Sequence, residues 1–241
     1  MLVWAHRLRP GFVELPTVGF AAKECRITIT CSAETRRRYD GAAGAWLAWG
    51  SLLSLHEPLI GRLFRRRAFD ISRVGRILDV GSGAGQILKH ILAHRRPECA
   101  VVAFDLSTRM LSRARARLRR PEIDFVGGDA ARLPFADASF DYVTCGWMIE
   151  HLSDPCAGLK EMARVMKSDG RLLLLATENT WAGSALSQAW KCRTFGRAEL
   201  RSLCSEAGLD LTAEFWLTSV HKFFRMGGIL VEARKSTRDS R

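Results

Sequence analysis

The sequence predicts an α/β fold built on a doubly wound, mostly parallel sheet of seven strands. The length of 241 residues suits one large domain, and 47% hydrophobic with 26% charged residues is ordinary globular composition. This composition excludes disordered, collagen-like and coiled-coil classes. From Arg76 onward, short apolar runs alternate with amphipathic stretches, which is the pattern of consecutive βαβ units.

The elements follow from hydrophobic periodicity, because buried parallel strands read as near-continuous apolar runs. Gly208 suits the position just after a helix end. The expected strands are 76–80, 100–104, 123–127, 140–145, 171–177, 209–218 and 227–234. The expected helices of the core are 85–95, 107–120, a short one at 130–133, 155–168 and 196–207.

The chain divides into three parts by the texture of its sequence. Residues 1–33 contain several Pro and Gly residues without a clear period, and we expect a flexible arm there. Residues 34–234 form the domain, with a helical cap at 34–75, interrupted near 41–44 and at Pro58, and the α/β core at 76–234. A polar tail at 235–241 ends the chain.

The charge of the chain points to an anionic partner. Lys and Arg number 37 against 25 Asp and Glu, so the net charge is +12. Residues 1–75 hold 12 basic and 6 acidic side chains, about twice the excess per residue of the remainder. Such an excess favours attraction to a nucleic acid, a membrane surface or an acidic substrate.

The cysteine pattern and hydropathy suggest a compartment. The seven cysteines are odd in number and none forms a C-x-x-C pair, which argues against a disulfide framework or zinc ribbon. No apolar run reaches the roughly 18 residues of a membrane span, and the N-terminus has no convincing secretory signal. We therefore expect a cytosolic protein.

A glycine-rich turn after the first core strand carries the strongest local signal. Residues 78–85 read LDVGSGAG, which gives the spacing G-x-G-x-G. Backbone N–H groups at a strand–helix turn can face a bound ligand. The spacing differs from the G-x-G-x-x-G of dinucleotide sites. Asp79 inside the strand would repel a pyrophosphate, but it suits a ligand that carries an ammonium or sulfonium group.

Four further motifs follow in order. They are Asp105 at the end of the second strand, Gly128-Asp129-Ala130 after the third, Leu133-Pro134-Phe135 with Ser139-Phe140-Asp141-Tyr142-Val143 at the fourth, and LKEMARVMKSDGRL over 159–172. With the glycine turn, they make residues 36–234 resemble the class I S-adenosylmethionine-dependent methyltransferases. The family usually has Lys-Pro-Gly-Gly where this chain has Lys167-Ser168-Asp169-Gly170, a structural turn.

The resemblance implies a Rossmann-like fold and S-adenosyl-L-methionine as cofactor. Asp105 would accept hydrogen bonds from the ribose hydroxyls, and Asp129 from the adenine amino group. Taken singly, Asp105 would also suit a helix cap and Asp129 a turn. The cofactor contacts that we expect are Tyr39, Asp79, Gly81, Ser82, Gly83, Gly85, Asp105, Leu106, Asp129, Ala130 and Cys145.

We expect the catalytic residues and the acceptor site beyond the carboxyl ends of the fourth and fifth strands. The stretch Glu150-His151-Leu152 resembles the ubiquinone- and menaquinone-type branch of the family. His151 is the candidate general base, because a neutral imidazole titrates near physiological pH. Glu150 could orient it or bind a divalent ion, although we predict no metal site. The alternative is that both residues lie on a helix facing solvent or the sheet edge; His221 is a less favoured candidate base.

Tryptophans suggest where an acceptor would bind. Residues 178–194 hold Trp181 and Trp190 and look like a substrate lid, and Trp147 follows the fourth strand. We expect these three side chains to contact an apolar or aromatic acceptor, with simple packing as the alternative.

The basic front end allows two interpretations. Arg36–Arg38 precede Tyr39 and an apolar run at 42–55 with two tryptophans, and Arg65–Arg67 follow. In related methyltransferases such a segment folds over the cofactor. An apolar helix flanked by arginines also fits an interfacial membrane element, but a lid helix packed on the sheet with solvated arginines is the favoured interpretation.

Motifs of other methyl transfer chemistries are missing or misplaced. The Asn/Asp-Pro-Pro-Tyr of amino-directed base methylation is absent after the fourth strand. Pro155-Cys156 lies at the start of a helix, where Pro is favoured in any case, and not where a cytosine C5 nucleophile would be.

We therefore predict a methyltransferase acting on a small hydrophobic acceptor such as a quinone precursor, a lipid or a secondary metabolite. An anionic membrane surface, with peripheral attachment, is the further partner that the front end allows. The charge of +12 suggests an RNA methyltransferase as the alternative, but no RNA-binding module is apparent, and we expect no nucleic acid partner. A cofactor-binding scaffold without catalysis is the other alternative. The methylated atom and the oligomeric state stay open.

Overall fold

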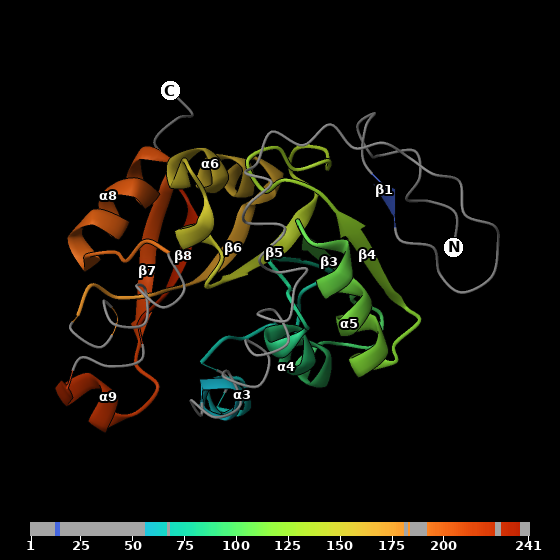
Figure 1. Cartoon of the computed structure of the whole chain (residues 1–241), viewed down its shortest axis with the longest axis horizontal. Helices are drawn as coiled ribbons and strands as arrows, with labels where there is room; N and C mark the ends of the chain where they lie inside the picture. Colours follow the sequence, from blue (N-terminus) through green and yellow to red (C-terminus); the bar gives the residue numbers. More distant parts are fainter. Residues whose placement is uncertain are drawn as a thin grey trace.

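The computed structural model describes residues 13–14, 56–66, 68–180, 183, 192–224 and 228–236. Its centre is a sheet of eight strands in the order β1-β4-β3-β2-β5-β6-β8-β7 (Figure 1). The strands are β1 Val13–Glu14, β2 Arg76–Val80, β3 Ala100–Asp105, β4 Ile123–Gly127, β5 Phe140–Gly146, β6 Met166–Ala176, β7 Leu209–Phe215 and β8 Ile229–Lys235. The predicted seven-stranded sheet is confirmed, and the two-residue β1 adds an edge strand from the segment predicted as an arm.

The direction of the strands places the ligand edge of the sheet. Strands β4, β3, β2, β5 and β6 are parallel, and β8 is antiparallel to both β6 and β7. Strand β7 therefore runs in the same direction as the parallel strands. The carboxyl ends of all six lie along one edge, which is where ligands bind in open α/β sheets.

Helices cover both faces of the sheet (Figure 1). One core cluster joins the sheet to α6 and α8, and the other joins it to α3, α4 and α5. Neighbouring strand residues alternate between these clusters, as Ile77 and Leu78 do. The helices are α3 His56–Arg65, α4 Gln86–His94, α5 Thr108–Leu118, α6 Pro155–Val165, α8 Arg197–Glu206 and α9 Ser219–Phe224, with a 3₁₀ turn η2 at Ile149–His151.

Three local predictions differ from the structure. The expected short helix at 130–133 is a turn, because the Asp129 carboxylate accepts the Ala131 N–H and offers the backbone a local alternative. Pro58 does not interrupt a helix but lies in the first turn of α3, where its missing N–H costs nothing. Strand β6 begins at Met166, so the preceding helix ends at Val165 rather than at residue 168.

None of the helices in the described ranges is long and apolar enough to span a membrane. The expected cap at 34–75 is described only from residue 56, where α3 packs against α4 through the ring pair of Phe64 and His90.

A buried polar network joins β5 to β8 across β6. The hydroxyl of Tyr142, which is fully buried, donates to Glu232 Oε1 at 2.9 Å. Arg171 lies over the Tyr142 ring, 5.0 Å from its centroid, and its Nη1 is 3.4 Å from the same Glu232 oxygen. Burial and the Glu232 charge raise the pKa of Tyr142 well above its ordinary value, so the phenol stays a donor.

The Tyr142→Phe substitution is expected to lower the free energy of unfolding by about 1.5–3 kcal/mol, because Glu232 loses a hydrogen bond in a buried place. Urea unfolding measures the change. Cofactor affinity should be unaltered, since Tyr142 lies toward the start of β5, away from the ligand edge. A stability unchanged within about 0.5 kcal/mol would contradict the importance of this network.

Candidate functional site

The glycine turn joins β2 to α4 in a conformation that glycine allows. Gly81, Gly83 and Gly85 have φ values of 75°, 52° and 82°. The N–H groups of Gly81 and Ser82 both donate to the carbonyl oxygen of Phe104, at 2.8 and 3.0 Å. The turn is thereby fixed against the end of β3, and a Cβ on Gly81 would lie only 2.4 Å from that of Met148.

Asp105 connects this turn to the next helix. Its Oδ2 accepts the N–H of Gly83 at 2.8 Å, and its Oδ1 accepts the N–H of Ser107 at 2.8 Å. Ser107 in turn caps α5 by accepting the N–H of Met110. Asp105 is half-buried, and a carboxylate oxygen can accept more than one hydrogen bond. The structure therefore brings together the turn and the acid that the sequence predicts as neighbours.

Asp79 lies beneath the turn and is 1% exposed. Its Oδ1 accepts the hydroxyl of Thr144 at 2.5 Å, while its Oδ2 is buried without a hydrogen-bond partner in the described part of the chain. Burial raises the pKa of this carboxyl to about 6. A buried carboxylate oxygen without a partner is costly, and a cationic ligand would supply the missing interaction.

The remaining predicted cofactor residues border the same edge. Gly128 donates its N–H to the carbonyl of Asp105 at 3.1 Å, which places Asp129 beside the end of β3. Asp129 and Leu106 are half-buried, and Ala130 is buried. Cys145 differs, because its side chain is fully buried in the core and burial raises its pKa well above the ordinary value. Only its main chain is available for a ligand.

Two predicted acceptor residues, Trp181 and Trp190, and the predicted cofactor residue Tyr39 lie outside the described residues. Trp147 is described and half-buried, with a left-handed φ of 51° that is uncommon for a residue with a side chain. Its N–H donates to the carbonyl of Leu175 at 2.8 Å, so the chain turns sharply where β5 ends.

Glu150 and His151 lie on the 3₁₀ turn η2 beyond β5. Glu150 is 5% exposed, and its Oε1 accepts the hydroxyl of Thr177 at 2.6 Å. Its Oε2 is buried with no hydrogen-bond partner among the described residues. Burial raises the pKa of Glu150 to about 7. Glu150 thus faces the protein rather than solvent, whereas His151 is half-exposed.

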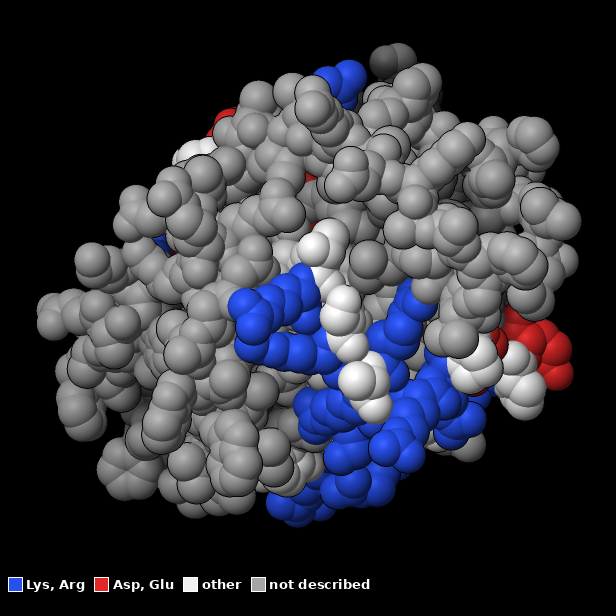
Figure 2. Space-filling view, turned by 45° about the vertical axis from the view of Figure 1, so that its right-hand side comes forward, with Lys and Arg blue, Asp and Glu red and all other residues white. Residues whose placement is uncertain are grey.

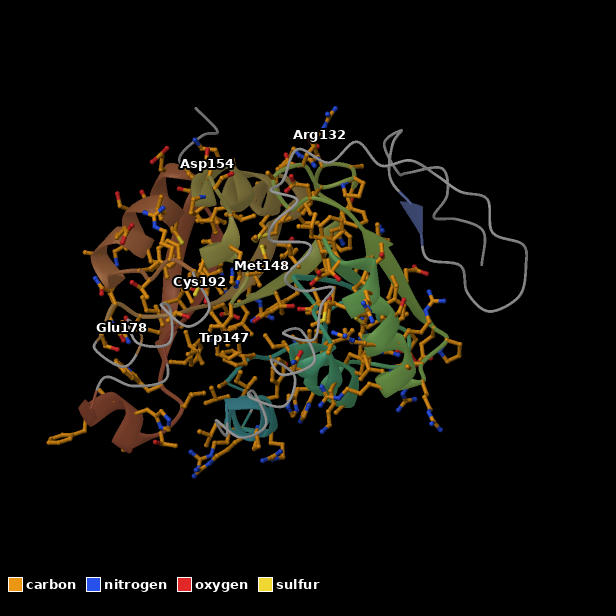
Figure 3. All side chains as sticks on the ribbon, in the orientation of Figure 1. Arg132, Trp147, Met148, Asp154, Glu178 and Cys192 are labelled. Atoms are coloured by element: carbon orange, nitrogen blue, oxygen red, sulfur yellow. The ribbon has the colours of Figure 1, made fainter. Side chains whose placement is uncertain are left out.

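Cys192 completes a cluster that the sequence does not predict. One ligand atom each from Glu150, His151 and Cys192 lies within 4.8 Å of the others. Figure 3 shows Cys192, Met148 and Trp147 in one region near the end of β5. Carboxylate, imidazole and thiolate together are donors that zinc accepts. The three side chains can therefore act as a base with its supporting groups, or hold a metal ion.

Buried charges fix the segment that carries Cys192. Arg197 makes two 2.8 Å hydrogen bonds to the carboxylate of Glu178, which is 3% exposed, and also pairs with Glu214. The N–H of Phe195 donates to the carbonyl of Thr177 at 2.9 Å. The two ends of the segment 178–195 are thus held together against β6. Thr144, Thr177 and Cys192 carry no motif, so no sequence signal identified them.

Comparison with known proteins agrees with this geometry. Residues 78–174 match the family model described as a methyltransferase domain. A demethylmenaquinone methyltransferase of Beutenbergia cavernae is 39% identical over 139 residues, covering 56% of this chain and 55% of that protein. A ubiquinone/menaquinone biosynthesis C-methyltransferase of Desulfotalea psychrophila is 30% identical over 161 residues, covering 66% and 65%. The chain thus matches 55–65% of the length of these relatives.

The fold agrees with solved structures. The magnesium protoporphyrin IX methyltransferase of Synechocystis PCC 6803, solved with bound SAH, superposes with a TM-score of 0.65. It is 15% identical, and the match covers 84% of this chain and 99% of that one. Family model and fold agree that this chain contains a Rossmann-like methyltransferase domain of the S-adenosylmethionine-dependent kind, and the relatives that it resembles carry the names of ubiquinone and menaquinone methyltransferases.

Proposed function

We propose that the chain transfers a methyl group from S-adenosylmethionine to a small hydrophobic acceptor, a demethylated quinol precursor. The observation that carries the cofactor assignment is the buried carboxylate of Asp79 with its unpartnered Oδ2, directly beneath a turn of three left-handed glycines. This arrangement fits a ligand whose positive charge faces the Asp79 carboxylate. The names of the relatives support the acceptor class.

The residues at the edge of the sheet would divide the cofactor between them. Asp105, whose carboxylate is held at the end of β3 by the N–H groups of Gly83 and Ser107, would accept the ribose hydroxyls. Asp129 would accept the adenine amino hydrogens, and Asp79 would face the positive charge. When bound, S-adenosylmethionine supplies a methyl group on a sulfonium sulfur that is already activated for displacement.

The protein then has to orient the acceptor and remove one proton. His151 would take the proton of an acceptor hydroxyl, so that electron density reaches the carbon or oxygen that attacks the methyl group. Glu150 lies in the same cluster and would stabilise the imidazolium that forms. Its carboxyl, with a pKa of about 7, is partly ionised at neutral pH.

A direct test is incubation of the purified full chain with methyl-tritiated S-adenosylmethionine and three acceptors in parallel. These are a short-chain demethylmenaquinol kept reduced, total lipid extract and tRNA. Label in the quinol supports the proposal. Label in tRNA alone would replace it with the RNA methyltransferase alternative, and label in none of the three would favour a cofactor-binding scaffold.

The Asp105→Ala substitution is expected to weaken S-adenosylmethionine binding by about 10- to 100-fold, because each charge-assisted hydrogen bond to the ribose contributes about 1.5–3 kcal/mol. Isothermal titration calorimetry measures this on the folded variant. The matched control is Asp169→Ala, which removes an exposed carboxylate from the β6 turn and should leave affinity unchanged. Equal affinities for the Asp105 variant and the native chain would remove Asp105 from the site.

Cofactor affinity is expected to depend on pH through Asp79. Its raised pKa of about 6 means that the free protein holds a proton there below pH 6. A cationic ligand prefers the carboxylate, so affinity should be constant above about pH 7 and fall by up to about tenfold per unit below pH 6. Calorimetry from about pH 8 to about pH 5 measures the profile. Asp79→Asn should bind weakly at every pH with a flat profile, and a flat native profile would show that Asp79 does not face the charge.

The His151→Ala substitution is expected to lower kcat by about 10²- to 10⁴-fold while cofactor affinity is kept, as for loss of a general base. The matched control is His221→Ala, whose ring is hydrogen-bonded to the Thr218 hydroxyl at 2.7 Å. Rates measured with the tritiated cofactor decide between them. A loss of kcat in the His221 variant alone would move the base. Loss of native activity on chelation, restored by zinc, would assign the cluster to a metal instead.

A further inference from the structure

A cationic cavity lies at the ligand edge of the sheet, between α3 and the connection from β7 to α9. Its volume is about 420 Å³. Arg62 and Arg66 enter it from α3 and the residue after it, and Lys222 enters from α9. Ser219 and Trp216 add a hydroxyl and an indole to the wall. None of the described residues that line the cavity is acidic.

The three cations of this cavity differ from Arg164 and Arg197 in their lack of carboxylate partners among the described residues. Arg164 and Arg197 each pair with two carboxylates. The side chains of Arg62, Arg66 and Lys222 make no ion pair or hydrogen bond with the described part of the chain. Three positive charges around one small cavity repel one another. An anion bound among them would attract all three and offset this repulsion.

An exposed aromatic side chain follows one of the cavity residues on α9. Phe223 follows Lys222 on α9, and its side chain is 81% exposed. Among the described residues it is the large hydrophobic side chain that is exposed to solvent. A cation beside an exposed aromatic ring is the combination found where a protein contacts the boundary between lipid head groups and acyl chains.

The wider surface adds attraction for the same kind of partner. Helix α5 and the two residues after it carry six arginines and no acid over 108–120. Figure 2 shows Lys and Arg side chains gathered over one region of the described surface. Such a field concentrates anions near the molecule over about a Debye length, although it does not select among them.

We propose that this cavity binds the phosphate group of an anionic phospholipid, with Phe223 inserted at the interface, and so attaches the chain peripherally to a membrane. The Arg62, Arg66 and Lys222 side chains would bind the phosphate oxygens, and Ser219 would donate a further hydrogen bond. Nucleic acid also offers phosphodiesters, and its bases could stack on an exposed Phe223. The comparison of vesicles with tRNA separates the two partners. The attachment does not require methyl transfer, so the two proposals can fail separately.

The experiment is co-sedimentation of the full chain with vesicles of phosphatidylcholine alone and of phosphatidylcholine with phosphatidylglycerol. The cavity variant is Arg66→Gln with Lys222→Gln. The matched control is Arg201→Gln with Arg234→Gln, which removes two exposed cations on α8 and β8 that make no side-chain hydrogen bond or ion pair with the described residues. Each cation at an anionic surface contributes about fivefold in affinity, so the cavity variant should bind about 25-fold more weakly.

The remaining arms separate the lipid from other sources of phosphate. The native chain should prefer vesicles with phosphatidylglycerol, the control should stay within about twofold of it, and Phe223→Ser should weaken binding even where salt screens the charges. Equal losses in cavity and control variants would overturn the site. Binding of glycerol phosphate or tRNA that depends on the cavity, without any response to vesicles, would overturn the lipid. Calorimetry with S-adenosylmethionine should give native affinity in every variant, which keeps this test independent of the methyl transfer proposal.

Discussion

The end of β3 controls the geometry of the ligand edge. The carbonyl of Phe104 accepts two N–H groups from the glycine turn, and the carboxylate of the next residue, Asp105, accepts one from that turn and one from the start of α5. Phe104 and Asp105 thus fix the glycine turn and the start of α5 relative to each other, and with the turn they fix the start of α4. Left-handed backbone at Gly81 and Gly83 is what lets the turn reach these acceptors. A side chain at Gly81 would strain the backbone and displace Met148.

Two buried carboxylates give the edge its electrostatic character. Asp79 on β2 and Glu150 beyond β5 each have one oxygen bound to a threonine hydroxyl and one without a hydrogen-bond partner among the residues that the structure describes. Burial raises the pKa of both carboxyl groups, and their negative charges also raise the pKa of the buried Cys145 thiol. In the free protein each carboxyl is held at a cost in desolvation. A positively charged ligand lowers that cost, so the site favours a cation before any specific contact is considered.

Much of this edge could be predicted from the sequence, because its parts are local. Apolar runs identify buried parallel strands, and the spacing of Gly81, Gly83 and Gly85 at a strand–helix turn marks where main-chain groups are open to a ligand. The contacts that join distant segments could not be predicted. The N–H of Arg193 donates to the carbonyl of Glu150 at 3.2 Å, which brings the neighbouring Cys192 to Glu150, and Arg197 pairs with Glu178 at the ends of the same segment. Arg66 approaches Lys222 only through the fold. The expected helix at 130–133 does not form, because the Ala131 N–H donates to the side chain of the neighbouring Asp129 and this bond outweighs helical propensity over four residues.

The cavity and the cofactor edge are connected through packed elements. Helix α3, which supplies two cavity cations, packs on α4, and α4 begins directly after Gly85 of the glycine turn. On the other side, β7 leads into the cavity at Trp216, over which Arg197 lies at 4.1 Å while it pairs with Glu178. The same arginine therefore fixes one wall of the cavity and one end of the segment that carries Cys192. Because β7 runs parallel to β5 and β6, the cavity opens at the edge of the sheet where the acceptor would bind. A phosphate held among Arg62, Arg66 and Lys222 would turn that edge toward the bilayer, which is the orientation that an acceptor dissolved in lipid requires.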